Sequence, residues 1–484
     1  MASNTAATAS TGLTVHMNHH RIESPADTPN FIDHEFRPSQ ATKWFPVHDP
    51  ATNNLVTRVP QSTPEELAAA VTSAQNAFPA WRATSLIARQ QIMFRFTHLI
   101  KENRDRLAAS ITLEQGKTFK DARGDVLRGL QVAETACGIT TQLPGEVLEV
   151  ARDMETRSYR EPLGVVAAIC PFNFPAMIPL WGVLNIIHGS VDTVNFILDE
   201  PVIRAISFVG SNRAGEYIYA RGSANGKRVQ ANLGAKNHAV LLPDADRNAA
   251  LDAIVGAAFG AAGQRCMALS VLVIVGDDAD YIPALIEKAR GLVVSAGFEK
   301  NADVGPVISP ESKAKIESLI TSGEREGATI VLDGRGYKSE KYANGNFVAP
   351  TILTNVTTDM KCYREEIFGP VLVCLSVKTL EEAIQLVNAN EYGNGVSIFT
   401  KSGVSAAYFQ KNIQVGQVGV NVPIPVPLPM FSFNGNKKSI AGGGANTLYG
   451  KPGLAFYTQQ KTVTSLWRRE NIDTGKQVVM PSHL

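Results

Sequence analysis

The chain has 484 residues, of which 44% are hydrophobic and 39 are glycine, so it is long enough to form two or three segments with cores of their own. Its 46 Lys and Arg residues are balanced by 45 Asp and Glu residues, which leaves no basic field to attract nucleic acid or an anionic membrane. No apolar run is long enough to span a bilayer. The composition therefore favours small-molecule chemistry.

The N-terminal residues 1–30 are rich in Ala, Ser and Thr and contain no acidic residue before Glu23. Arg21 is their only arginine, whereas transit peptides are usually rich in arginine. We expect a disordered tail or a weak transit peptide. Five scattered cysteines without a C-x-x-C pair indicate neither a disulfide framework nor a zinc site, and they fit a reducing compartment.

Strand-like and helix-like segments alternate along the chain, which predicts an α/β fold with a largely parallel sheet. Thr63-Pro64-Glu65-Glu66 begins a helix that runs toward Ala77, because threonine caps the helix, proline fits its first turn and glutamate completes a capping box. Thr379 and Glu382 predict the same start for a later helix. Residues 145–160 predict an exposed hairpin.

Residues 163–170, LGVVAAIC, are continuously apolar and predict a buried strand. The motif PFNFP at 171–175 follows at the carboxyl end of this strand, where open α/β sheets bind their ligands. Cys266 lies in a loop of small residues, GAAFGAAGQRCMALS at 256–270, with Arg265 beside it. A thiol in such a loop suits a covalent nucleophile, and a buried structural cysteine is the alternative.

These motifs, with AISFVGS at 205–211 and EEIFGPV at 365–371, resemble the aldehyde dehydrogenase superfamily over nearly the whole chain. Within it, VQANLGAKNH at 229–238 and GQVGVNVPIPVPLPMFSF at 416–433 are similar to the methylmalonate-semialdehyde dehydrogenases, which acylate coenzyme A. The resemblance implies a Rossmann-type dinucleotide domain, an α/β catalytic domain and a β arm that joins subunits.

By this resemblance, residues 31–142 and 161–233 form the NAD-binding domain and residues 234–445 the catalytic domain. Residues 143–160 and 456–468 are expected to be arm strands that pair between subunits in a homotetramer, and an ordinary surface hairpin is the alternative. Eukaryotic members of the family imply the mitochondrial matrix, with the cytoplasm as the alternative compartment.

The resemblance also implies the catalytic residues. Cys266 is the nucleophile, and its own N–H group and the side-chain amide of Asn173 hold the oxyanion; Asn173 capping a turn is the alternative. Arg128 and Arg265 contact the carboxylate of malonate or methylmalonate semialdehyde, which becomes acetyl-CoA or propionyl-CoA with loss of carbon dioxide. We expect Arg265 to lower the pKa of the Cys266 thiol as well.

Where hydrolytic relatives have a glutamate general base, in the segment Glu-Leu-Gly-Gly-Lys, this chain has Asn232 at the start of Asn232-Leu233-Gly234-Ala235-Lys236. Asparagine cannot accept a proton from water, so the substitution favours transfer of the acyl group to coenzyme A over hydrolysis. The remaining implied contacts are with NAD, at its nicotinamide, pyrophosphate and ribose: Cys170, Phe172, Gly210, Ser211, Leu233, Glu366 and Phe368.

The family's Lys-Pro-Ser-Glu motif, which contacts the adenosine ribose, is missing, because Trp181 is followed directly by Gly182. Only 14 residues separate Cys170 from the next predicted strand, 185–188, which leaves room for one crossover helix. The dinucleotide domain is therefore expected to be one strand and one helix short. A wrongly omitted coding segment, a splice form and a remodelled enzyme all explain this, so a catalytically silent subunit and a cofactor-independent esterase stay open.

Overall fold

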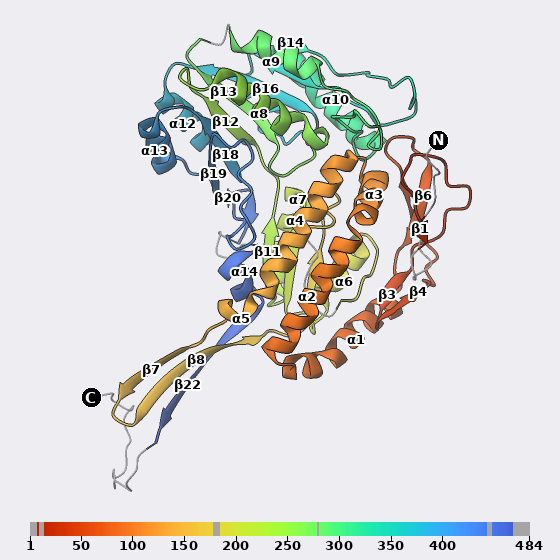
Figure 1. Ribbon diagram of the computed structural model, residues 1–484, viewed down its shortest axis with the longest axis vertical. Coiled ribbons are helices and arrows are strands. Elements are labelled where there is room, and N and C mark those ends of the chain that lie inside the picture. Colours follow the sequence, from red (N-terminus) through yellow and green to blue (C-terminus); the bar gives the residue numbers. More distant parts are fainter. Residues whose placement is uncertain (1–6, 9–13, 178–183, 278–279, 443–447, 468–484) are drawn as a thin grey trace.

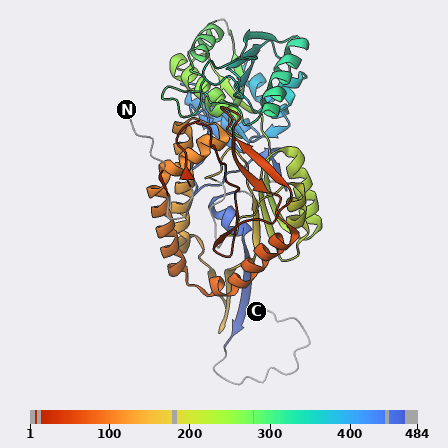
Figure 2. The ribbon, with the colours of Figure 1, turned by 90° about the vertical axis from the view of Figure 1, so that its right-hand side faces the viewer.

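Two β-sheets, each covered by helices, and one long arm make up the computed structural model, which describes residues 7–8, 14–177, 184–277, 280–442 and 448–467 (Figure 1). A seven-stranded sheet and the arm lie at opposite ends of the molecule, and Figure 2 shows the same arrangement from the side. The expected α/β class with largely parallel sheets is confirmed. Among the described helices, none is long and apolar enough to cross a membrane.

The larger sheet has the order β14-β15-β16-β13-β12-β18-β19, and all its pairs are parallel except β14 with β15. The central strands are continuously apolar because helices α8 and α12 pack against them, so both faces are buried. The strands of this sheet are Asn237–Leu241 (β12), Leu269–Val275 (β13), Thr329–Leu332 (β14), Thr351–Thr354 (β15), Val371–Val377 (β16), Gly395–Phe399 (β18) and Gln417–Val420 (β19).

The smaller sheet has the order β21-β11-β10-β9, with only the short β21 antiparallel. Its strands are Val166–Ile169 (β9), Ala205–Val209 (β10), Arg228–Asn232 (β11) and Ile440–Ala441 (β21). β9 was predicted as a buried strand, and that burial is wrong, since Val166 is 41% exposed and β9 is the edge of the described sheet. The continuous apolar run predicts neighbours on both sides, and the strand beyond β9 is missing.

The predicted strand at 185–188 is also wrong. Within the described residues this segment makes one isolated antiparallel bridge, from Ile186 to Phe31, and joins neither sheet. The chain then enters α6, Val191–Asp199. β9 stays an unpaired edge of the described sheet, and this segment contacts Phe31 instead. The sheet is thus shorter than the expected one, and Trp181 itself lies outside the described residues.

The arm is a three-stranded antiparallel sheet with the order β22-β8-β7. Its strands are Glu146–Ala151 (β7), Met154–Pro162 (β8) and Thr458–Leu466 (β22). The hairpin predicted at 145–160 is present. The expectation that the two arm segments pair between subunits is corrected, because β22 pairs with β8 of the same chain over its full length.

Four long helices, α1 to α4, cover the lower half of the body in Figure 1. Thr63 caps α1 with the predicted capping box, although the helix continues to Ala83. At α12, Thr379 caps as predicted, but the Glu382 carboxylate accepts from the N–H of Lys378 instead of closing the box. The helices are Pro64–Ala83 (α1), Leu86–Glu102 (α2), Arg104–Gln115 (α3), Phe119–Cys137 (α4), Ile139–Gln142 (α5), Asn212–Ala224 (α7), Arg247–Phe259 (α8), Tyr281–Arg290 (α9), Pro310–Arg325 (α10), Lys361–Arg364 (α11), Leu380–Ala389 (α12), Gly403–Asn412 (α13) and Gly450–Phe456 (α14).

The N-terminal segment is packed from well before residue 30. His19 is buried, with Nδ1 2.9 Å from Oδ2 of Asp49, and its ring packs against Phe298. The remaining short strands are Ala7–Thr8 (β1), Thr14–Val15 (β2), Asn30–Ile32 (β3), Glu35–Arg37 (β4), Trp44–His48 (β5), Leu55–Pro60 (β6), Tyr392–Gly393 (β17) and Asn436–Lys437 (β20). The expected tail of 30 residues is therefore too long.

Candidate active site

Cys266 lies in the loop between α8 and β13, and the backbone of this loop is unusually turned. The 3₁₀ turn Gly260–Gly263 (η1) contains two alanines, Ala261 and Ala262, in the left-handed region. A side chain at Gly263 would meet the carbonyl oxygen of Gly369 at 2.0 Å, so only glycine allows this close approach. The small residues thus let the loop pack tightly beside the EEIFGPV segment, with Cys266 half-buried.

Two buried asparagines hold the Cys266 peptide. The side-chain Nδ2 groups of Asn237 and Asn394 donate to the Cys266 carbonyl oxygen at 2.8 and 3.0 Å. The side-chain oxygen of Asn237, Oδ1, accepts a hydrogen bond from the N–H of Gly395 at 3.0 Å, and this bond fixes the orientation of the Asn237 amide. Sequence reasoning missed both residues; Asn237 lies inside the quoted motif at 229–238, and that position was the available signal.

Asn173, the expected oxyanion donor, is brought to the nucleophile loop. Its side chain is 5% exposed, and Nδ2 donates to the carbonyl oxygen of Gln264, two residues before Cys266, at 3.1 Å. An amide nitrogen carries two N–H groups, so this bond orients the amide and uses one of them. The geometry suits an amide that faces the nucleophile loop, as the resemblance implies.

The pKa of the Cys266 thiol is raised overall, although Arg265 acts to lower it as expected. Burial, with a smaller contribution from the Glu366 carboxylate, raises the pKa of Cys266 to about 12. Arg265 opposes that shift weakly, since its guanidinium donates to Oδ1 of Asp121 at 2.6 Å and is already paired. The Cys266 thiol therefore needs a proton acceptor or a bound ligand before it acts as a thiolate.

The two predicted substrate arginines flank one face of α4. Asp121, the partner of Arg265, begins this helix, and Arg128 lies seven residues later, about 10 Å along the helix axis and on the same face. Arg128 donates only to Gln131 at 3.1 Å among the hydrogen bonds of the described residues. A side chain at Gly260 would lie 2.7 Å from the Arg265 guanidinium, so glycine makes room for it.

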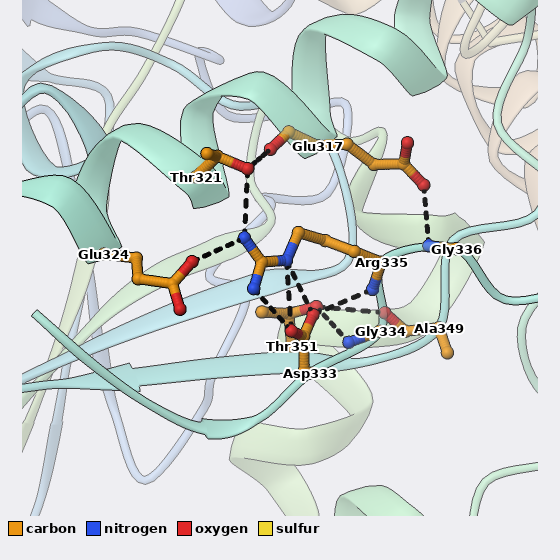
Figure 3. Close-up of polar contacts among 9 residues, drawn as sticks. All are labelled: Glu317, Thr321, Glu324, Asp333, Gly334, Arg335, Gly336, Ala349 and Thr351. Carbon is orange, nitrogen blue, oxygen red and sulfur yellow. Dashed lines mark hydrogen bonds and ion pairs between the residues drawn. The ribbon is translucent and has the colours of Figure 1, made fainter.

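A second arginine, Arg335, shows how an arginine is bound when all its donors are used within the protein. Arg335 binds Asp333, Glu324 and Thr321 at 2.6 to 3.1 Å, and every nitrogen of its guanidinium is occupied by these partners (Figure 3). This cluster joins α10 to the loop after β14. Compared with it, Arg128 has donors to spare, which is what binding a substrate carboxylate requires.

The nicotinamide side of the expected cofactor site is assembled from several segments. Oε1 of Glu366 accepts from the N–H of Ala235 at 3.0 Å, and burial raises the pKa of this carboxyl. Phe368 has a left-handed backbone, and its ring lies 5.9 Å from that of Phe172, edge to face. Leu233 is buried against α7 at Gly215. Four of the implied residues thus lie together where β11 crosses into β12.

The segment is pinned by a lysine that sequence reasoning did not select. Lys236 is fully buried and donates to the carbonyl oxygens of Cys362 and Glu365, both at 2.7 Å. Burial lowers the pKa of Lys236 to about 8. The lysine therefore ties the Asn232–Lys236 segment to the end of α11, just before Glu366.

The pyrophosphate side shows an open helix start. Gly210 and Ser211 precede α7, and the Ser211 side chain makes no capping hydrogen bond, so the first N–H groups of a 13-residue helix are available to an anion. Cys170 is exposed at the end of β9. On the adenosine side, however, the described sheet ends at β9. The residues present fit the nicotinamide and pyrophosphate, and the strand expected to hold the adenosine ribose is missing.

Asn232 lies at the end of β11 with its side chain buried, and its Oδ1 has no hydrogen-bond partner in the structure. Its position and its lack of a proton-accepting group agree with the substitution found in the sequence. In the described part of the chain, no general base of the hydrolytic type occupies this position.

A half-buried cysteine in a loop held by amides, beside the strands of a largely parallel sheet, is an arrangement that suits the class of α/β enzymes with acyl intermediates on a thiol. A model of the aldehyde dehydrogenase family matches residues 36–182 and 182–463. The chain belongs to this family. The two matches meet at residue 182, where the Lys-Pro-Ser-Glu unit is missing from the sequence.

Relatives agree over most of the chain. A mouse (Mus musculus) mitochondrial protein named methylmalonate-semialdehyde/malonate-semialdehyde dehydrogenase [acylating] is 53% identical over 492 residues, 93% of this chain and 92% of its own. Since 93% of 484 residues is about 450, roughly 40 of the 492 aligned positions are empty in this chain. A strand and a helix with their loops need about that length.

Solved structures show the same fold. A protein assigned as methylmalonate-semialdehyde dehydrogenase from Sinorhizobium meliloti 1021, complexed with NAD, has a TM-score of 0.91 at 38% identity, covering 93% of this chain and all of that one. The methylmalonate-semialdehyde dehydrogenase of Oceanimonas doudoroffii has a TM-score of 0.89 at 39% identity, covering 92% and 99%. The expected family and its fold are therefore confirmed.

Proposed function

We propose that this chain is an NAD-dependent, coenzyme A-acylating dehydrogenase of malonate and methylmalonate semialdehyde. The observation that carries the proposal is Asn232, which stands where a hydrolytic enzyme needs a proton acceptor. The names of the mouse and bacterial relatives support the same substrates, and the acylating activity is part of the mouse protein's name.

In this proposal the Cys266 sulfur adds to the aldehyde carbon and its proton leaves to a base. The oxyanion accepts hydrogen bonds from the N–H of Cys266 and from Nδ2 of Asn173, while Arg128 and Arg265 bind the substrate carboxylate. To bind it, Arg265 exchanges its Asp121 partner for the substrate.

NAD, when bound, supplies the acceptor for the hydride that leaves the adduct. Gly210 and Ser211 would hold its pyrophosphate, Glu366 its nicotinamide ribose, and Leu233, Cys170, Phe172 and Phe368 would line the nicotinamide cleft. The thioester left on Cys266 is then attacked by the thiolate of coenzyme A, so the C–S bond to Cys266 breaks as the new C–S bond forms. The substrate carboxylate leaves as carbon dioxide, and the carbanion left on the neighbouring carbon takes up a proton.

We further propose the predicted division into an NAD-binding domain, a catalytic domain and an arm, with subunits joined through the arm in a tetramer. Trp467 is 79% exposed, and Val147 and Leu148 are also exposed on the arm, so assembly would cover apolar side chains that are exposed in a single chain. The mitochondrial names of the eukaryotic relatives support the mitochondrial matrix.

A second candidate follows from the shortened sheet. Because the described sheet ends at β9 on the adenosine side, a cofactor-independent esterase that uses Cys266 and Asn173, or a silent subunit, fits the chain if NAD does not bind. Cofactor dependence separates the three: the dehydrogenase needs NAD for any product, the esterase needs none, and the silent subunit gives none.

The test supplies malonate semialdehyde and NAD to the purified chain and follows NADH with and without coenzyme A. Turnover that requires coenzyme A supports the proposal. Ester cleavage at Cys266 without any NADH formation would replace it with the esterase, and a folded protein that does neither would leave the silent subunit.

A further inference from the structure

The turn between α3 and α4 is held unusually tightly against the catalytic half of the chain. Gly116 adopts a left-handed backbone at φ +91°. A side chain at Gly297 would meet the Lys117 carbonyl oxygen at 2.4 Å, and one at Gly305 would meet the Gly116 carbonyl oxygen at 2.1 Å. The N–H of Phe119 donates to the carbonyl oxygen of Gly297 at 2.9 Å. The backbone of Lys117 is therefore fixed before its side chain is considered.

The Lys117 side chain is 2% exposed and ends at the segment Asn173–Met177, which carries the proposed oxyanion donor. Its Nζ donates to the backbone carbonyl oxygen of Asn173 at 2.6 Å and lies 4.3 Å from the centre of the Phe174 ring. The same nitrogen is 3.4 Å from Oδ2 of Asp125, which is fully buried. A buried ammonium is retained only where such partners replace water.

Asp125 faces the other end of the same segment. The backbone N–H groups of Ala176 and Met177 favour its charged form, while burial raises the pKa of this carboxyl. Burial in turn lowers the pKa of Lys117, and Asp125 and Asp121 oppose that shift. Oδ1 of Asp125 has no hydrogen-bond partner of good geometry in the structure. Lys117 thus contacts the segment Asn173–Met177 at Asn173, and Asp125 is the buried partner of its ammonium.

We infer that Lys117 and Asp125 are positioning residues, which hold the Asn173–Met177 segment so that the Asn173 amide keeps its place beside the nucleophile loop. The inference rests on the proposed role of Asn173 as the oxyanion donor. Both residues come from the turn and helix α4, not from the shortened sheet, so the oxyanion amide is anchored independently of the missing strand and helix. Neither residue touches the reacting atoms.

The test compares two reactions of Cys266 that differ in their need for an oxyanion donor and that require no NAD. Acylation by p-nitrophenyl acetate passes through a tetrahedral oxyanion, whereas alkylation by iodoacetamide displaces iodide and forms none. We expect Lys117→Met to slow acylation by at least about tenfold, and to leave alkylation within about twofold. Lys120→Met, which changes an exposed lysine on the first turn of α4, is the matched control.

A double-mutant cycle separates positioning from general damage. In an Asn173→Ala background, Lys117→Met should slow acylation by less than about twofold further, because its effect acts through the missing amide. If Lys117→Met alone does not fold, the double variant Lys117→Met, Asp125→Leu is used instead, because it also removes the buried carboxylate that would be left unpaired. Both acylation and alkylation are then measured on this double variant.

Equal losses in acylation and alkylation, or losses that add in the cycle, would overturn the inference. The inference would also be overturned if Cys266 of the wild-type chain reacted with iodoacetamide but not with p-nitrophenyl acetate, because the inference requires a working oxyanion amide in this chain. Failure of the proposed dehydrogenase activity is distinguishable, because acylation without NADH formation leaves the positioning role intact.

Discussion

The two sheets of this molecule differ at their edges. The seven-stranded sheet is enclosed by helices, and its strands β13 and β16 are buried through most of their lengths. The four-stranded sheet ends at β9, where Val166 is 41% exposed, and the two matches to the family model meet nearby in the chain, at residue 182. The contrast teaches that the residues for acyl chemistry and those for the dinucleotide need not be retained together.

The nucleophile loop depends almost entirely on the enclosed sheet. Asn237 at the start of β12, Asn394 just before β18 and the α8–β13 loop fix Cys266. Asn173 is the exception, because it follows β9. Predictions that separate the acyl chemistry from dinucleotide binding therefore test the comparison directly.

The largest expected effect is loss of the nucleophile. Cys266→Ala should reduce both ester acylation and NADH formation by at least about a thousandfold, because no other group can form the thioester. Intact-protein mass measures the acyl adduct. Cys137→Ala, at a buried cysteine on α4, is the control and should keep the adduct; an adduct that persists in Cys266→Ala would contradict the assignment.

Removal of the oxyanion amide should be the next largest effect. Asn173→Ala is expected to slow acylation by about 100- to 1000-fold, the range for one lost donor, with alkylation by iodoacetamide nearly unchanged. Stopped-flow release of p-nitrophenol measures it. A loss below threefold would assign Asn173 to turn capping, the alternative that the sequence left open.

Inserting the roughly 40 missing residues of a relative between Trp181 and Gly182 tests the same comparison by extending the smaller sheet instead of removing a side chain. We expect NAD to bind at least about tenfold more tightly, about 1.4 kcal/mol, because the insertion supplies the adenosine side. Calorimetric titration of both chains with NAD measures it. Equal affinities would mean that this chain binds NAD through a remodelled domain.

The pH dependence of the thiol gives a further test. Because the pKa of Cys266 is raised to about 12, its thiolate fraction should rise about tenfold per pH unit between pH 7 and 10, and the alkylation rate with it. Rates of iodoacetamide alkylation across that range measure it. A plateau reached by pH 8 would show a lowered pKa and contradict burial as the dominant influence on this thiol.

The last prediction compares the stabilities of the two sheets. Leu272→Ala in the enclosed strand β13 should destabilise folding by about 2–5 kcal/mol, since its side chain is fully buried. Val166→Ala on β9 should cost under about 1 kcal/mol, because 41% of Val166 is already exposed. Denaturant unfolding measures both, and a cost at Val166 as large as that at Leu272 would mean that β9 is covered after all.

Features that depend on a local residue pattern or on a family motif could be predicted from the sequence. The α/β class, the helix start at Thr63, the hairpin at 145–160 and the proximity of Asn173 to the Cys266 loop all rest on local patterns or on the family resemblance.

The features that were not predicted depend on contacts between residues that are far apart in the chain. The burial of β9 was mispredicted because its apolar pattern fits a neighbour that the chain lacks. The strand at 185–188 was mispredicted because the one described bridge of this segment is to Phe31 and not to a sheet edge. The raised pKa of the Cys266 thiol was not predicted, because it comes mainly from burial and burial depends on packing between segments distant in the chain. Lys117 contacts Asn173 across 56 residues, which no local pattern indicates.

The most direct measurement is to acylate Cys266 with p-nitrophenyl acetate in the absence of NAD and then add coenzyme A. We predict that acetyl-CoA forms as the adduct disappears, at a rate that exceeds release of free acetate and is absent in Cys266→Ala. Acetate as the main product, with coenzyme A having no effect on its rate, would contradict acyl transfer as the function of this site.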